Sequence, residues 1–201
     1  MRIFLASQGL GALRDFLDGA RDVLYVPTAA KPMVDKSSAE GNHKALEALG
    51  YRVVELDIDG IDESKLSPLA SVDAVFVEGG SPFFLLQAMR ESGFAEAVTE
   101  AVHNGLAYVG MSAGAVVAGP DLEPLAATSN TALGPRLRST KALGLVDLVV
   151  FPHHNAPDRA AQFAEARTRY GSRFELVPLA DTEAMIVDDG GARLVPSELQ
   201  G

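Results

Sequence analysis

Short apolar runs alternate with longer helix-compatible stretches along most of the 201-residue chain, and this alternation limits the possible folds more than any other feature. The runs are rich in Val, Ile, Phe and Tyr, as expected for strands buried on both faces of a parallel sheet. Parallel neighbours need a crossover connection, usually a helix, so the pattern predicts an α/β fold with a mostly parallel sheet flanked by helices. The expected strands are Ile3–Ser7, Val23–Pro27, Arg52–Asp57, Ala74–Glu78, Ala107–Met111, Leu148–Phe151 and Phe174–Val177.

The stretches between these strands predict helices, whereas the end of the chain predicts a hairpin. Ala184–Val187 and Ala192–Val195 flank a tight Asp/Gly turn, which is typical of two antiparallel strands. The long irregular segment Ala118–Thr140 is expected to help form a wall of a site. No shift in composition and no repeat marks a second domain, so residues 1–201 are expected to form one domain. The expected helices lie near Gly9–Asp18, Ser37–Leu49, Phe83–Arg90, Phe94–Asn104, Ala113–Val117 and Arg159–Tyr170.

Charge and cysteine content exclude several classes of function. The chain has 17 Lys and Arg against 27 Asp and Glu, a net charge of −10, which opposes phosphate backbones and anionic membranes. We therefore expect neither a nucleic-acid nor a membrane partner. There is no cysteine, which excludes disulfides, thiolate metal sites and cysteine nucleophiles, so covalent catalysis must use oxygen. The apolar run in Met1–Ser7 is too short for a signal peptide, and we expect a cytoplasmic protein.

The strongest local motif is Gly-x-Ser-x-Gly at the end of the strand Ala107–Met111, directly before a helix. In that context the motif is typical of a nucleophile elbow, a tight turn that projects its serine above the sheet. Ser112 is therefore the candidate nucleophile, and the N–H of Ala113 at the helix N-terminus is a candidate donor to an oxyanion. The alternative is an ordinary Gly-Ser turn.

A second strand, Ala74–Glu78, ends in the glycine pair Gly79-Gly80 and is also followed by a helical segment. Ligands in open α/β sheets bind outside the carboxyl ends of the strands, so the N–H of Gly80 or Ser81 is expected to supply the second oxyanion donor. In the plain alternative, Ser81 is the helix N-cap and Pro82 the first helical residue. The two roles are compatible.

A serine nucleophile needs a base, normally histidine. His43 and His103 lie within expected helices, where solvated positions suit them better than catalysis. His153 and His154 follow the strand Leu148–Phe151, so they are expected on the same rim of the sheet as the nucleophile. One of them is the candidate base, the alternative being two loop histidines without a catalytic role.

The group that orients the histidine is expected to be an acid near the end of the chain. Asp181 follows the strand Phe174–Val177 and returns to the same rim, whereas Glu183 lies two residues further and is the second choice. The order Ser, His, acid differs from the order Ser, acid, His of α/β-hydrolase enzymes. The chain order therefore favours a different fold.

These motifs together resemble the peptidase S51 family, which includes an aspartyl dipeptidase and cyanophycinase. Gly79–Ser81 is similar to the family's Gly-Gly-Asn-Thr segment, and Gly110–Ala115 to its Gly-Trp-Ser-Ala-Gly-Ala elbow. Phe151–His153 stands where the family has Asn-Pro-His, which selects His153 over His154 as the base. Leu179–Asp181 matches its Leu-Pro-Glu, with an aspartate in place of the longer glutamate.

The resemblance implies a core like that of class I glutamine amidotransferases and one catalytic domain over residues 1–201. It implies a serine peptidase that hydrolyses short peptides, foremost Asp-X dipeptides, through an acyl-enzyme. Arg159 matches a family arginine that opens a helix, and with Asp158 as N-cap it is placed to bind a substrate carboxylate; the alternative is a solvated helix residue. Ser81 and His154 are further candidates for substrate contact.

Three other functions remain open from the sequence. The chain could be a cyanophycinase-like hydrolase of β-aspartyl linkages or a binding protein without turnover. An esterase of the α/β-hydrolase type would need an acid between the serine and the histidine, with Asp121 or Asp147 as candidates. We expect no metal and no other cofactor, a small peptide as the partner, and a monomer or homodimer.

Overall fold

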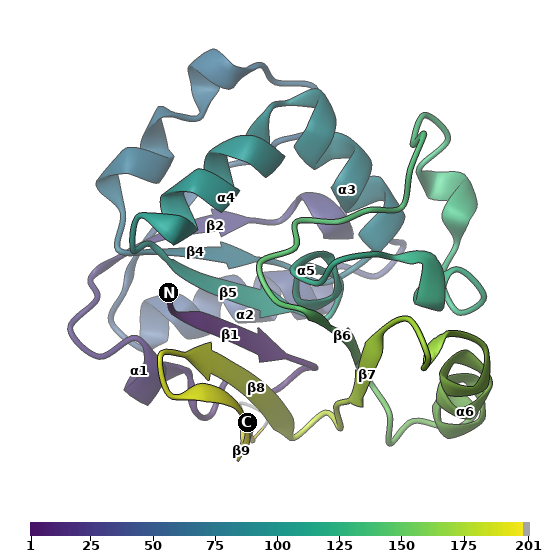
Figure 1. The fold of residues 1–201 in the computed structure, drawn as a ribbon. Helices are drawn as coiled ribbons and strands as arrows, with labels where there is room; N and C mark the ends of the chain where they lie inside the picture. The colour runs from purple at the N-terminus through teal and green to yellow at the C-terminus, as the bar shows by residue number, and fades with distance from the viewer. Residues whose placement is uncertain (199–201) are drawn as a thin grey trace.

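A seven-stranded sheet runs through the computed structural model, which describes residues 1–198 (Figure 1). Its strand order is β3-β2-β4-β5-β1-β8-β9. Neighbouring strands from β3 to β1 run parallel, and β8 is antiparallel to both of its neighbours, β1 and β9. The mostly parallel α/β fold with a C-terminal hairpin is thereby confirmed. The strands of this sheet are β1 (Ile3–Ala6), β2 (Asp22–Val26), β3 (Arg52–Glu55), β4 (Ala74–Val77), β5 (Ala107–Met111), β8 (Glu183–Asp188) and β9 (Gly191–Pro196).

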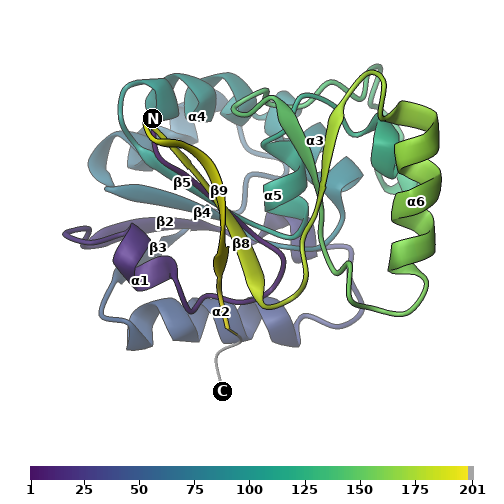
Figure 2. The same cartoon turned by 60° about the horizontal axis from the view of Figure 1, so that its bottom comes forward.

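Two strands of the chain form a separate sheet. β6 (Leu148–Phe151) and β7 (Glu175–Pro178) pair with each other in parallel and, within residues 1–198, with no strand of the large sheet. Helix α6 (Arg159–Tyr170) connects them, and Figures 1 and 2 show this unit at one side of the molecule. The unit packs on the core through apolar side chains such as Phe151 and Phe163, whose rings lie 5.3 Å apart between centroids.

Helices cover both faces of the large sheet because its strands alternate their apolar side chains between two layers. In β1, Ile3 and Leu5 pack with α3, α4 and α5, whereas Phe4 packs with α1 and α2 on the other face (Figure 2). None of the helices in residues 1–198 is long and apolar enough to cross a membrane. The helices are α1 (Leu13–Phe16), α2 (Ser37–Ala48), α3 (Pro82–Glu91), α4 (Phe94–His103), α5 (Ala113–Val117) and α6; short 3-10 helices lie at Thr28–Ala30, Glu63–Lys65, Ser67–Ser71, Glu123–Leu125 and Thr131–Leu133.

One expected helix is much shorter than predicted. The helix expected near Gly9–Asp18 is reduced to α1, a single turn. The residues before it pack against the end of the chain instead, since Gly11 N donates to Glu198 O at 3.1 Å. At Gly9 a Cβ would lie 1.6 Å from Ser197 O, so only glycine allows this approach. A contact between the two ends of the chain therefore overrides the local helical pattern.

Candidate active site

The turn between β5 and α5 projects Ser112 at the carboxyl end of the large sheet. Ser112 has φ 45° and ψ −102°, a conformation that residues with a side chain rarely adopt. Its backbone N–H donates to Ala6 O at 2.9 Å, which ties the turn to the end of β1. The helix that follows lies close to β4, because a Cβ at Gly114 would approach Val77 O to 2.1 Å. The motif therefore forms the tight strand-to-helix turn expected of a nucleophile elbow.

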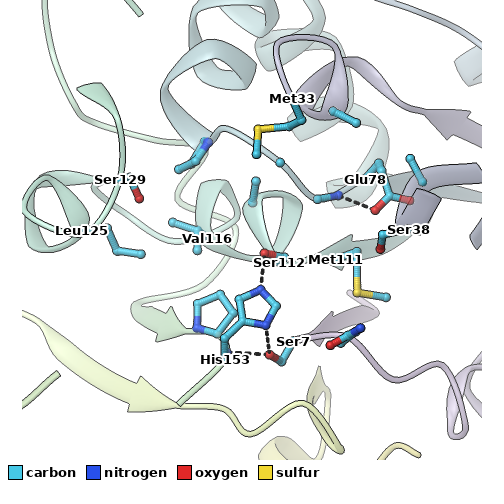
Figure 3. A pocket seen from close by; sticks show the side chains of 18 of the residues that line it. Ser7, Met33, Ser38, Glu78, Met111, Ser112, Val116, Leu125, Ser129 and His153 are labelled. Atoms are coloured by element: carbon cyan, nitrogen blue, oxygen red, sulfur yellow. Dashed lines mark hydrogen bonds between the residues drawn. The ribbon is translucent and has the colours of Figure 1, made fainter. Parts of the chain in front are cut away.

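Ser112, His153 and Asp181 lie in one chain of hydrogen bonds. Ser112 Oγ is 3.0 Å from His153 Nε2, and His153 Nδ1 is 2.6 Å from Asp181 Oδ1 (Figure 3 shows the first two residues). With Nδ1–H donating to the carboxylate, Nε2 is left to accept the proton of the serine hydroxyl. His153 and Asp181 follow the two strands of the small sheet, and Ser112 follows a strand of the large sheet.

The other acidic candidates face different partners. Glu183 Oε2 accepts a hydrogen bond from Ala180 N at 2.9 Å, and Asp121 Oδ1 accepts one from Glu123 N at 2.9 Å. Asp147 is exposed. The structure thus brings Asp181 alone among these acids to the imidazole, and the arrangement that an α/β-hydrolase would require is not present.

Gly80 and Ala113 line the cavity in front of Ser112, and within residues 1–198 neither backbone N–H has a protein acceptor. Gly80 has φ 140°, and a Cβ there would lie 2.1 Å from Ala29 O, so glycine is required at this position. The N–H of Ser81 donates to Ala29 O at 2.9 Å, and its Oγ accepts from Phe84 N at 3.3 Å as the N-cap of α3. Gly80 and Ala113 are therefore the donors available to an oxyanion.

A cavity of about 400 Å³ opens in front of the serine and the histidine (Figure 3). Leu125 and Ser129 from the irregular segment form part of its wall, as the sequence predicted. The cavity is lined by Ser7, Gln8, Ala30, Met33, Asp35, Lys36, Ser38, Ala39, Glu78, Gly79, Gly80, Pro82, Met111, Ser112, Ala113, Val116, Leu125, Ser129, Phe151, Pro152, His153 and Arg159.

Of the three residues expected to contact substrate, Arg159 lines the cavity, whereas Ser81 and His154 do not. Arg159 lines the cavity at the start of α6, and its guanidinium donates to Gln162 Oε1 at 3.3 Å. Asp158 is the N-cap of that helix but forms no hydrogen bond with its side chain. Ser81 and His154 are not among the lining residues. The ring of His154 packs against that of Phe163, with 5.2 Å between the ring centroids.

Glu78 is a buried carboxyl group beneath the Gly79-Gly80 turn, and the sequence analysis gave it no role. Its Oε1 accepts from Gly79 N at 2.6 Å, and Asn42 Nδ2 lies 3.1 and 3.0 Å from its two oxygens. Tyr25 Oη is 2.7 Å from Glu78 Oε2 and 2.8 Å from Ala39 O. Burial raises the pKa of Glu78 above its ordinary value, against the opposing effect of these hydrogen bonds. Tyr25 Oη has one hydrogen but two oxygen atoms within hydrogen-bond distance. A protonated Glu78 can donate to Tyr25 Oη, which leaves the tyrosine hydrogen for Ala39 O.

Replacing Glu78 by glutamine is expected to change how stability depends on pH. The pKa of Glu78 is raised in the folded state, so the folded chain binds more protons than the unfolded chain above about pH 4.3, the unfolded value. The free energy of unfolding of the wild type should therefore fall, relative to the variant, as the pH rises through this window. Urea unfolding at about pH 4 and about pH 7 measures the difference, with Glu100→Gln on α4 as the control for charge. If the wild type and Glu78→Gln differ in free energy of unfolding by the same amount at both pH values, the pKa of Glu78 is not raised in the folded chain.

Ser7 is the second residue at this site to which the sequence gave no role, and it contacts both His153 and Asp181. It is 1% exposed at the end of β1, and its Oγ bonds both to Asp181 and to the backbone of His153. A polar residue at the carboxyl end of a buried strand was the available signal.

Within residues 1–198 no group of three or more His, Asp or Glu side chains has the arrangement of a metal site.

Comparison with known proteins gives consistent matches over most of the chain. The model of a family described as peptidase family S51 matches residues 7–195. An uncharacterized peptidase of Listeria monocytogenes is 31% identical over 168 residues, covering 83% of this chain and 82% of that one. Peptidase E of Streptomyces coelicolor is 33% identical over 164 residues, covering 79% of this chain and 66% of the relative.

A solved structure matches the same fold nearly end to end. The crystal structure of a Listeria monocytogenes protein assigned to peptidase E superposes with a TM-score of 0.88 at 27% identity, covering 98% of both chains. The likeness therefore includes both sheets and the C-terminal hairpin.

Proposed function

This chain belongs to peptidase family S51 and is a serine-type peptidase, and from that premise we propose that it hydrolyses short peptides through Ser112, His153 and Asp181. The observation that carries the proposal is the continuous line of hydrogen bonds from the serine hydroxyl through the imidazole to the carboxylate, at 3.0 and 2.6 Å. Each member has the partner that serine catalysis requires.

In the proposed reaction, Ser112 Oγ attacks the carbonyl carbon of the scissile amide while His153 Nε2 takes the hydroxyl proton. The carbonyl oxygen becomes an oxyanion, to which the N–H groups of Gly80 and Ala113 donate. His153 then gives its proton to the leaving amine, and an ester on Ser112 remains. Water, deprotonated by the same imidazole, hydrolyses this ester. Asp181 holds the Nδ1–H tautomer throughout and stabilises the imidazolium.

The proposed substrates are Asp-X dipeptides. The cavity of about 400 Å³ suits a small ligand. Its lining includes two cationic side chains, Lys36 and Arg159, beside the carboxyl groups of Asp35 and Glu78, in a protein of net charge −10. Arg159 is proposed to bind the aspartate carboxylate of the substrate, because its planar guanidinium can donate two parallel hydrogen bonds.

A fluorophosphonate probe and a dipeptide library test the proposed function directly. The probe should label the wild type at Ser112 and leave Ser112→Ala unlabelled, because only an activated serine reacts readily. The library should show hydrolysis of Asp-X dipeptides by the same protein. Absence of labelling would instead indicate a binding protein on this fold, and labelling without dipeptide hydrolysis would indicate another hydrolase substrate.

Replacing Arg159 by alanine is expected to weaken hydrolysis of Asp-X dipeptides selectively. The loss in kcat/KM should correspond to about 1.5–3 kcal/mol, the range for a hydrogen bond to a charged group. Dipeptides with a neutral first residue should barely change. Steady-state kinetics on Asp-Ala and Ala-Ala measure the contrast, and Arg167→Ala on the exposed face of the same helix controls for the lost charge. Equal losses on both substrates would show that Arg159 does not bind this carboxylate.

A further inference from the structure

We propose that Ser7 is a positioning residue that holds the base and the acid of the proposed triad at their working distance from the nucleophile. The inference rests on the proposed function, since it concerns the geometry of Ser112, His153 and Asp181. Ser7 itself is not a second nucleophile. Its hydroxyl hydrogen points to Asp181 Oδ1 at 2.9 Å, and its oxygen accepts from His153 N at 2.7 Å (Figure 3 shows the histidine contact).

The position of Ser7 relative to the nucleophile is set by the backbone of the large sheet. β1 and β5 are parallel neighbours in which Ala6 pairs with Met111, so Ser7 and Ser112 are the first residues after the ends of two adjacent strands. Ser112 N donates to Ala6 O at 2.9 Å across the same pair. A group bound to the Ser7 side chain is therefore held at a fixed place relative to Ser112.

The base and the acid reach the site from the small sheet, which shares no strand ladder with β1 or β5 in the described residues. His153 follows β6 and Asp181 follows β7. The alignment of Ser112 with His153 thus depends on contacts across the junction of the two sheets. Ser7 Oγ makes a short contact to each of these residues, at 2.9 Å to Asp181 Oδ1 and 2.7 Å to His153 N, and it also lies 3.4 Å from His153 Nδ1. Ser7 is 1% exposed, so water does not compete for these contacts.

Both contacts act on features that catalysis needs. His153 has φ 62°, a conformation that a non-glycine residue holds only when its surroundings fix it, and the bond from its N–H to Ser7 Oγ contributes to this. The Asp181 oxygen that accepts from Ser7 is the same one that accepts from His153 Nδ1 at 2.6 Å. Ser7 therefore restrains both the backbone that carries the imidazole and the oxygen that orients it.

The test is Ser7→Ala, with Ser7→Thr to restore the hydroxyl and Ser92→Ala as the matched control. Ser92 is also a buried serine, with Oγ 2.8 Å from Ala88 O, but it lies at the end of α3 and outside the cavity. For Ser7→Ala we expect kcat to fall about 10- to 100-fold with KM changed less than about twofold, as for a misplacement of catalytic groups. Fluorophosphonate labelling should slow to a similar extent.

Proton NMR gives a readout that a loss of stability alone does not move. The low-field resonance of the His153 Nδ1 proton should shift or broaden in Ser7→Ala and remain unchanged in Ser92→Ala. Thr at position 7 should restore both the resonance and most of kcat. Rates are taken per folded protein, from circular dichroism under the assay conditions.

Wild-type kcat in Ser7→Ala, or an unchanged Nδ1 resonance, would overturn the role of Ser7 while leaving the triad intact. An equal loss of kcat in Ser92→Ala would overturn it as well. Wild-type activity of His153→Ala would show a failure of the proposed function instead, so the two failures are distinguishable.

Discussion

Replacing Ser112 by alanine is expected to lower kcat by about 10⁶-fold, and replacing His153 by alanine should lower it by a similar factor. The serine supplies the bond to the substrate, and without the imidazole its hydroxyl stays protonated and weakly nucleophilic. The double variant should be little slower than either single variant, because the two residues act as one unit at 3.0 Å. Binding and the oxyanion donors account for the residual rate.

Two nearby residues provide controls for these variants. Ser129 lines the same cavity, and His154 adjoins the base in sequence without lining it. Ser129→Ala and His154→Ala should each retain most of kcat, measured on the best dipeptide from the library. Thermal unfolding should show that the four single variants and the double variant all fold. Loss of activity in His154→Ala with normal activity in His153→Ala would show that the wrong histidine had been identified.

Replacing Asp181 by asparagine is expected to lower kcat by about 10⁴-fold while the fold is kept. The carboxylate accepts the Nδ1–H of His153 at 2.6 Å. An amide can instead present its NH₂ group, which favours the tautomer whose Nε2 already carries a hydrogen and has no lone pair for the serine proton. An amide also fails to stabilise the imidazolium of the transition state.

Glu183→Gln is the matched comparison, since it neutralises a carboxylate two residues away that bonds to Ala180 N. Its kcat should remain within about tenfold of the wild type, because the carboxylate that contacts the imidazole of His153 is kept. Steady-state kinetics on one substrate rank the two variants. The reverse ranking would assign the third role to Glu183.

Local signals were sufficient to predict the elements on either side of Ser112 and the strand before His153. Ala107–Met111, Ala113–Val117 and Leu148–Phe151 begin and end where the sequence predicted them. Each is a mostly apolar run or an Ala-rich segment, with Ser112 between the first two and Pro152 directly after the third, so propensity and pattern agree. Ser112 follows a strand of the large sheet, whereas His153 and Asp181 follow strands of the small sheet, so the three meet where the two sheets adjoin and not, as the sequence predicted, on one rim of a single sheet.

Local sequence signals could not predict contacts between distant parts of the chain. The pairing of β6 with β7 in a sheet of their own depends on how this unit packs against the core, and the sequence pattern of a buried strand is the same in either sheet. Ser7 and Glu78 each follow an apolar strand as one polar residue, and their roles depend on partners up to 174 residues away in sequence. A single sequence contains no record of these partners.

The division of the site between two sheets has a consequence for how activity is lost. Separating the small sheet from the large one breaks the apolar packing between them, side-chain contacts and loop hydrogen bonds, but no strand ladder, whereas unfolding the large sheet also breaks its ladders. Local opening of this kind requires less free energy than global unfolding. On heating, we therefore expect activity to be lost while the strand ladders of the large sheet are still formed, and on cooling to return without refolding of those ladders.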